Sequence, residues 1–87
     1  MSILRDLRDR HIKALLLIGD LEDEGVLPVL RDVVEVLGTR HDYAHSTLED
    51  LKRWGLVEEV RVGRKGKIRG FRLTKKGRKL LEELRKI

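Results

Sequence analysis

The sequence lacks several residue types, and each absence excludes a kind of chemistry. It contains no cysteine, asparagine or glutamine, and only one residue each of proline, methionine, tryptophan, tyrosine and phenylalanine. Without cysteine, disulfide bonds, thiolate metal sites and cysteine redox chemistry are all excluded. No apolar run is long enough to span a bilayer and no signal-peptide pattern is present, so we expect a cytoplasmic protein without membrane contact.

Charged residues make up 40% of the sequence and are placed unevenly. Residues 61–79 hold ten Lys or Arg and no acidic residue, whereas residues 1–60 hold 8 basic and 13 acidic residues. A segment of one sign is an electrostatic footprint for phosphate groups, which indicates a nucleic-acid partner. The alternative is a solvated charged surface, but such surfaces usually intersperse both signs.

The length of the chain bounds its organisation. At 87 residues we expect a single domain over 1–87, which buries about 60 to 65% of its unfolded surface. High charge content without the thermolabile residues Asn and Gln is typical of proteins from hyperthermophiles.

Apolar spacing predicts two helices in the first half. Ser2 can cap a helix that begins at Ile3, continues to about Asp23 and ends at Gly25. Its apolar stripe is wide enough for its own core and a second subunit, although a purely intramolecular core is the alternative. Val26 and Leu27 fit a very short strand. Pro28 then suits the first turn of a second helix, whose buried face is Leu30, Val33, Val34 and Leu37 and which Gly38 ends.

A third helix and a basic hairpin follow. Ala44, Leu48 and Leu51 share one face and predict a helix from about Tyr43 to Trp54, ended by Gly55. Strand-like residues then flank a loop from Gly63 to Gly70 that carries Arg64, Lys65, Lys67 and Arg69. Thr74 is a good N-cap for a last helix over about 75–87, with Leu80, Leu81, Leu84 and Ile87 at helical spacing.

Two motifs identify this order of elements with a known family. The segment 51–57, LKRWGLV, resembles the Leu-x-x-x-Gly-Leu-Val junction between recognition helix and strand, and 71–77, FRLTKKG, is similar to the aromatic-x-Leu-Thr-x-x-Gly signature after the wing. Both occur in MarR and PadR-like transcriptional regulators, especially small archaeal relatives. The resemblance implies a mainly α (α+β) winged helix-turn-helix with a small antiparallel hairpin and N-terminal and C-terminal helices. The recognition helix would span about 42–54 and the wing about 61–73.

The resemblance also implies where DNA binds. The recognition helix would enter the major groove, and the wing would reach the backbone or minor groove. Candidate DNA-binding residues are therefore Arg40, His41, Tyr43, His45, Ser46, Glu49, Arg53, Arg64, Lys65, Lys67 and Arg69. The sequence departs from the pattern at Asp42, Glu49 and Asp50, because phosphates repel carboxylates, although Glu can accept from a cytosine amino group. This departure makes Arg40, His41, His45, Ser46 and the wing the stronger candidates for DNA contact.

Other chemistries fit the sequence less well. His41, His45 and Glu49 have a spacing that could hold zinc, but histidines that face solvent or phosphate are commoner, so we predict no metal and no cofactor. His45, Ser46 and Asp42 share an exposed helix face without a nucleophile elbow, and the loop glycines do not match a phosphate loop. An enzyme is therefore not expected.

The sequence thus predicts a sequence-specific regulator of transcription that binds double-stranded DNA as a homodimer through its first and last helices. One alternative is a chromatin or replication accessory protein that binds DNA with little sequence preference, which the acidic residues of the recognition helix keep open. The other is a winged-helix protein-interaction module, against which the basic wing argues. No small-molecule effector is indicated by the sequence.

Overall fold

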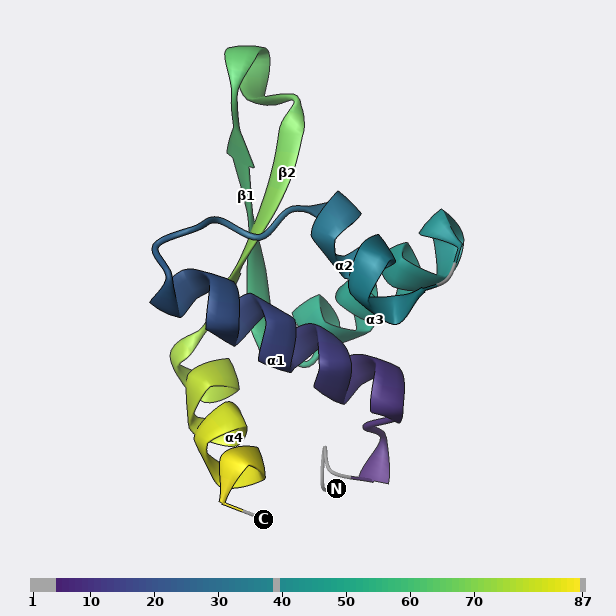
Figure 1. Ribbon diagram of the computed structural model, residues 1–87, viewed down its shortest axis with the longest axis vertical. Coiled ribbons are helices and arrows are strands. Elements are labelled where there is room, and N and C mark those ends of the chain that lie inside the picture. Colours follow the sequence, from purple (N-terminus) through teal and green to yellow (C-terminus); the bar gives the residue numbers. More distant parts are fainter. Residues whose placement is uncertain (1–4, 39, 87) are drawn as a thin grey trace.

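The computed structural model describes residues 5–38 and 40–86, which form helices around the base of one hairpin (Figure 1). Two antiparallel strands extend away from the helical body as a wing, with Val57 opposite Leu73 at the base and Val62 opposite Ile68 near the tip. In chain order the elements are α1 (Asp9–Asp23), α2 (Leu30–Leu37), α3 (His41–Arg53), β1 (Val57–Val62), β2 (Ile68–Leu73) and α4 (Lys75–Arg85).

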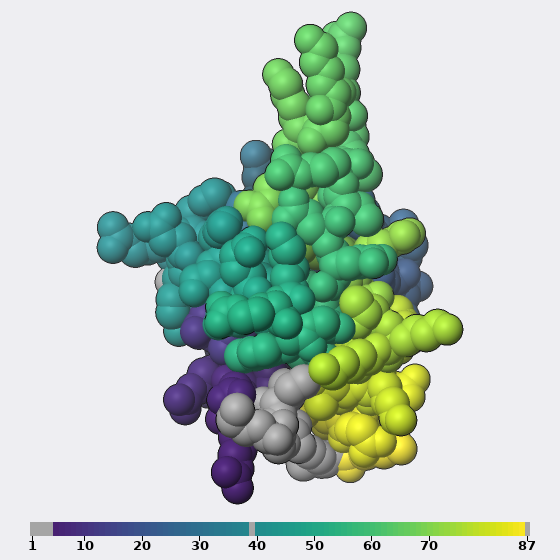
Figure 2. All heavy atoms as spheres, turned by 180° about the vertical axis from the view of Figure 1, so that it is seen from behind, coloured from purple at the N-terminus to yellow at the C-terminus, as the bar shows by residue number. Residues whose placement is uncertain are grey.

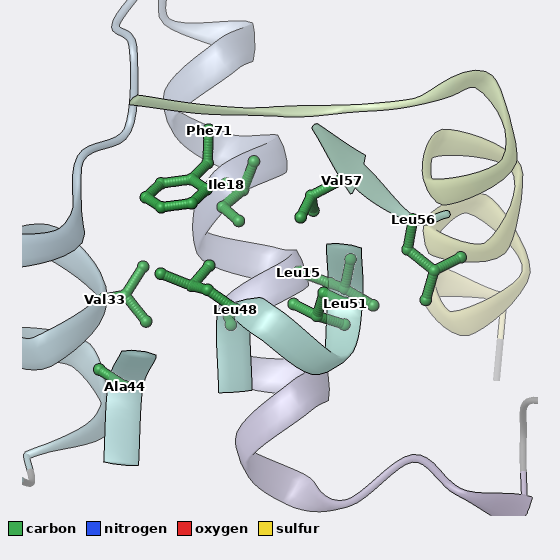
Figure 3. Packing of buried hydrophobic residues seen from close by; sticks show 10 residues of the cluster. Leu15, Ile18, Val33, Ala44, Leu48, Leu51, Leu56, Val57 and Phe71 are labelled. Carbon is green, nitrogen blue, oxygen red and sulfur yellow. The ribbon is translucent and has the colours of Figure 1, made fainter. Parts of the chain in front are cut away.

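The core lies where the first three helices meet the base of the hairpin (Figure 3). Each helix contributes the apolar face that its sequence spacing predicts, and the hairpin adds Phe71, which is fully buried. Burial of this apolar surface holds α3 against α1 and α2, so the polar face of α3 remains exposed. The cluster comprises Ala14, Leu15, Ile18, Val33, Ala44, Leu48, Leu51, Leu56, Val57 and Phe71.

The start of α1 differs from the sequence prediction. The helix begins at Asp9 and not at Ile3, which, like Ser2, lies outside the described residues. The imidazole of His11 is the reason: its Nδ1 accepts the backbone N–H of Arg8 at 2.9 Å and thereby caps the first turn. The predicted end near Asp23 is confirmed.

The segment between α1 and α2 also differs. Val26 and Leu27 form no strand; the only bridge there joins Val29 to Gly70 of the hairpin. The carbonyl of Pro28 accepts the N–H of Phe71 at 2.9 Å, so this residue precedes α2 and is not part of its first turn. These two contacts attach the start of α2 to the base of the wing.

Two boundaries near the wing are corrected. Helix α3 begins at His41, two residues before the start that apolar spacing predicted and one before the start that the resemblance implied, and its C-cap is Trp54. The loop of the wing is shorter than predicted, because β2 already begins at Ile68. Arg69 is therefore a strand residue and does not belong to the loop.

The last helix packs back on the first. Thr74 is its N-cap, as predicted, and the hydroxyl accepts the N–H of Gly77 at 3.0 Å. A side chain at Gly19 of α1 would overlap Leu81 of α4, so this glycine lets the two helices approach closely. No helix within 5–38 and 40–86 is both long and apolar enough to cross a membrane.

Candidate nucleic-acid interface

The exposed face of α3 and the wing lie on one side of the molecule (Figure 2). The first turn of α3 presents His41, Asp42 and Tyr43 to solvent, and Arg40 just before it is exposed as well. Ser46 is exposed, and the His45 side chain is 41% exposed. Donors and acceptors of these side chains can therefore reach a ligand laid along the helix.

The tip of the wing is a short turn rich in cations. Gly63 has φ +80°, and Lys65 has φ +60°, a conformation that non-glycine residues adopt rarely. Arg64, Lys65 and Lys67 are all exposed, and none of them forms an ion pair with any residue that the structure describes. Their charge is therefore available to an anion.

Arg69 lies apart from these tip cations. Its side chain is 23% exposed, and its Nη2 lies 2.8 Å from Glu59 Oε1 and 3.2 Å from Glu49 Oε1. The same guanidinium contacts His45, with Nη1 3.3 Å from Nε2. Lys52 completes this cluster, since its Nζ lies 3.0 Å from Glu59 and 3.3 Å from Glu49. Side chains from α3, β1 and β2 are thus joined in one network.

The network shifts the acid–base properties of its members. The hydrogen bond from Arg69 lowers the pKa of Glu59 to about 2, with Lys52 contributing and burial opposing. The hydrogen bond to Glu59 raises the pKa of both Lys52 and Arg69. Glu59, Lys52 and Arg69 therefore remain ionised near neutral pH.

A second cluster surrounds Asp50 on the flank of α3. Its Oδ2 lies 2.9 Å from Nε2 of the buried His11 and 3.4 Å from Arg10 Nη2, while Oδ1 accepts from Arg53 at 2.8 Å. Nδ1 of His11 already accepts a backbone N–H, so the proton of its neutral ring is on Nε2 and is donated to Asp50. Arg10 also donates to Thr47 at 2.8 Å.

These clusters change the interpretation of the acidic residues on α3. Glu49 and Asp50 are paired with cations, so the repulsion of phosphate expected from them is offset. Sequence reasoning missed the roles of Lys52 and Glu59. The i,i+3 spacing of Glu49 with Lys52, and of Asp50 with Arg53, was the available signal for two of these pairs.

Other cations of residues 61–79 are engaged elsewhere. Arg78 pairs with Glu22 at 2.9 Å, Lys76 donates to the carbonyl of Trp54, and Arg61 pairs with Glu59 at 2.9 Å while remaining 58% exposed. Within 5–38 and 40–86, no three His, Asp or Glu side chains are placed to hold a metal ion. The zinc hypothesis required His45 and Glu49 to bind one ion together. Glu49 forms ion pairs with Lys52 and Arg69 instead, and its Oε1 lies 3.9 Å from Nε2 of His45.

Comparison with known proteins shows the fold. No protein-family model and no curated protein sequence matches the chain. Among solved structures, a mutant of MepR from S. aureus has a TM-score of 0.81 at 18% identity over 92% of this chain and 57% of its own. The transcriptional regulator BldR from Sulfolobus solfataricus has a TM-score of 0.76 at 18% identity over 90% of this chain and 52% of its own. The chain thus spans little more than half the length of these two structures.

AF1382 from Archaeoglobus fulgidus is similar over a larger share of its own length. It has a TM-score of 0.80 at 17% identity, over 98% of this chain and 91% of that one. Another MepR mutant, with a TM-score of 0.79 at 19% identity over 91% of this chain and 56% of its own, was solved bound to an oligodeoxyribonucleotide. The likeness of these structures confirms the predicted winged helix-turn-helix as the fold.

Proposed function

We propose that this protein is a regulator of transcription that binds double-stranded DNA and has no enzymatic role. Helix α3 would enter the major groove, and the tip of the wing would contact the backbone or the minor groove beside it. The three cations Arg64, Lys65 and Lys67, which have no carboxylate partner among the described residues, carry this proposal. They stand at the end of a projecting hairpin, on the same side as the exposed face of α3 (Figure 2).

The chemistry of the surface supports the assignment of roles. Lys65 and Lys67 carry flexible ammonium groups, which suit phosphate better than a base edge. Arg64 can do the same or enter a narrow minor groove, where the negative potential is enhanced. Ser46 and His45 on α3 offer hydrogen-bonding groups of the kind that read base edges. The solved complex of a MepR mutant with an oligodeoxyribonucleotide shows that a protein of this fold binds DNA.

We further propose a two-fold homodimer in which α1 and α4 form the interface. Ile12 and Leu16 of α1 and Leu80 and Leu84 of α4 are only partly buried, so these helices retain apolar surface for a second subunit. A two-fold dimer would present two copies of α3 to half-sites about 34 to 36 Å apart. Sedimentation at micromolar concentration measures the mass directly, and a clean monomer would contradict both the dimer and a palindromic site.

Selection of bound sequences from a random duplex pool tests the function. A regulator should return a motif, and its affinity should fall steeply with salt because counterions are released on binding. Selection without a motif would favour the low-specificity accessory role instead. Affinity that does not change with salt would favour the protein-interaction role.

Substitutions on the wing and on α3 then test the proposed contributions of these two elements to DNA binding separately. Replacing Lys65 and Lys67 together by Ala should weaken binding to the selected and a scrambled duplex equally and lower the salt slope by roughly one per lost phosphate contact. As a control, Lys75 and Lys79 replaced by Ala remove the same charge from α4 and should have little effect.

Substitutions on α3 should act differently from those on the wing. Ser46→Ala or His45→Ala should cost about 1 to 3 kcal/mol on the selected site and little on the scrambled one. A wing pair that changes sequence preference while the α3 variants do not would show that base reading is assigned to the wrong element.

A further inference from the structure

Arg69 has a position unlike that of the other cations of the wing. It lies within β2 opposite Arg61, one residue pair from the tip end of the two strands, and its guanidinium turns toward α3 to contact Glu59, Glu49 and His45. Its Cζ lies 5.7 Å from the ring centroid of Phe71, a core residue, so the group rests on the core. The guanidinium therefore bridges the wing and α3.

The contacts of Arg69 leave it little capacity for DNA. Nη2 is shared between two carboxylates, Nη1 faces His45, and Nε is buried without a partner among the described residues. A phosphate would have to displace Glu59, the partner whose pKa this arginine lowers to about 2. Breaking such a partly buried, charge-assisted pair is costly.

The contact with His45 determines where the imidazole carries its proton. A guanidinium has only donors, so Nε2 of His45, 3.3 Å from Nη1, must be the acceptor. The neutral ring therefore carries its proton on Nδ1. Glu49 Oε1 lies 3.9 Å from Nε2, too far for a hydrogen bond that would favour the other tautomer. Nδ1 makes no hydrogen bond to any residue that the structure describes, so its N–H is the donor left for a ligand.

We propose that Arg69 is a positioning residue and not a DNA contact, locking the wing to α3 and fixing His45 as an Nδ1–H donor to acceptors in the major groove. Such acceptors are N7 and O6 of guanine, N7 of adenine and O4 of thymine. The inference rests on the proposed DNA-binding function and revises the role predicted for Arg69. Lys52 and Glu49 belong to the same lock, because they hold Glu59 and Arg69 from the side of α3.

The tautomer of His45 can be measured without DNA. Nitrogen-15 chemical shifts of the imidazoles at about pH 8 distinguish Nδ1–H from Nε2–H, and His45→Asn assigns the signal. We expect Nδ1–H for His45 and Nε2–H for His11, whose Nδ1 accepts a backbone N–H and which serves as internal reference. In Arg69→Lys the Nδ1–H population should fall, because one ammonium cannot reach Glu59, Glu49 and His45 together. An Nε2–H tautomer in the unmodified protein would overturn the proposal.

Binding to the selected and scrambled duplexes tests the consequence for recognition. Arg69→Lys keeps the charge, so the salt slope should persist while the ratio of the two affinities falls about tenfold, the size of one lost base contact. Arg61→Lys is the matched control, since Arg61 also pairs with Glu59 but is 58% exposed, and it should leave both the ratio and the tautomer unchanged.

The remaining outcomes are distinguishable. If Arg69→Lys retains the full ratio, Arg69 has no positioning role. If Arg69→Lys does not fold, the same two measurements are made on Glu59→Gln. Removing the carboxylate that holds Arg69 should likewise lower the Nδ1–H population of His45 and the ratio of the affinities for the selected and scrambled duplexes. If no form binds DNA, the proposed function fails, and the nitrogen-15 shifts alone decide whether the lock exists.

Discussion

Replacing Glu59 by Gln should remove an acid-sensitive contribution to the stability of the fold. In the folded protein this carboxylate has a pKa of about 2, compared with an ordinary value of 4.5, chiefly because Arg69 donates to it at 2.8 Å. Because the folded-state pKa is the lower one, ionised Glu59 stabilises the fold above pH 4.5, and this stabilisation is lost as the pH falls toward 2.

The size of the effect follows from the two pKa values. A fall from 4.5 to about 2 corresponds to about 3 kcal/mol of unfolding free energy between pH 5 and pH 2. The steepest change, about 1 kcal/mol per pH unit, should lie near pH 3. The Glu59 side chain is only 14% exposed, so solvent screens the pair weakly.

Urea denaturation followed by circular dichroism from pH 2 to pH 6 measures this contribution. The unfolding free energy of the unmodified protein minus that of Glu59→Gln should shrink by about 3 kcal/mol between pH 5 and pH 2. Glu58→Gln, at an exposed neighbouring position on β1, is the matched control and should follow the unmodified protein. Parallel curves for the unmodified protein and Glu59→Gln would refute the reasoning, because the ionised pair would then add no stability.

Two further substitutions test how α4 is joined to the wing. Gly77→Ala should destabilise the fold by about 3 kcal/mol or more in urea denaturation, because the added alanine Cβ would overlap the backbone carbonyl of Leu56. Wild-type stability of this variant would contradict such close packing. Thr74→Val should cost about 1 kcal/mol by the same measurement, since it loses the cap to the N–H of Gly77 and the hydrogen bond to the carbonyl of Gly55. An unchanged midpoint would show that the hydroxyl adds nothing.

Local signals in the sequence were sufficient for most of the fold. Apolar spacing identified the buried faces of α2 and α3, and the N-cap Thr74 marked the start of α4. These predictions succeed because spacing and capping act within a few residues. The start of α1 was wrong because the cap is supplied by His11, a residue type that sequence rules do not count as a capping partner.

The site was only partly predictable because its ion pairs depend on the register of the hairpin. Glu59 lies opposite Phe71 and Arg69 opposite Arg61, so Glu59 and Arg69 are diagonal neighbours across the two strands. The sequence predicted a loop from Gly63 to Gly70, which placed Arg69 at the tip and therefore away from Glu59. Once β2 begins at Ile68, the same arginine comes within reach of α3, and the acidic residues there acquire a partner.

The basic residues of 61–79 form one uniform run in the sequence, but the fold places them in different surroundings. Residues 61–79 carry ten basic side chains, but Arg61 and Arg69 share Glu59, and Arg78 pairs with Glu22. Lys75, Lys76 and Lys79 belong to α4 and not to the wing. Of the remaining four, Arg72 is exposed on β2 opposite Glu58, away from the tip, and Arg64, Lys65 and Lys67 form the tip. The three tip cations together with Arg40 before α3 therefore number four per subunit.

This division fixes the expected salt dependence of DNA binding. About 0.9 counterions are released for each phosphate neutralised, so about four contacts give a slope of about 3 to 4 per subunit in a plot of log affinity against log salt. If all ten basic side chains of residues 61–79 met phosphates, the slope would approach about 9. A titration from about 50 to 200 mM salt separates these values. A slope near 9 would show that all ten side chains meet phosphates on binding. Arg69 would then have to exchange its carboxylates for phosphate, which the lock between the wing and α3 does not allow.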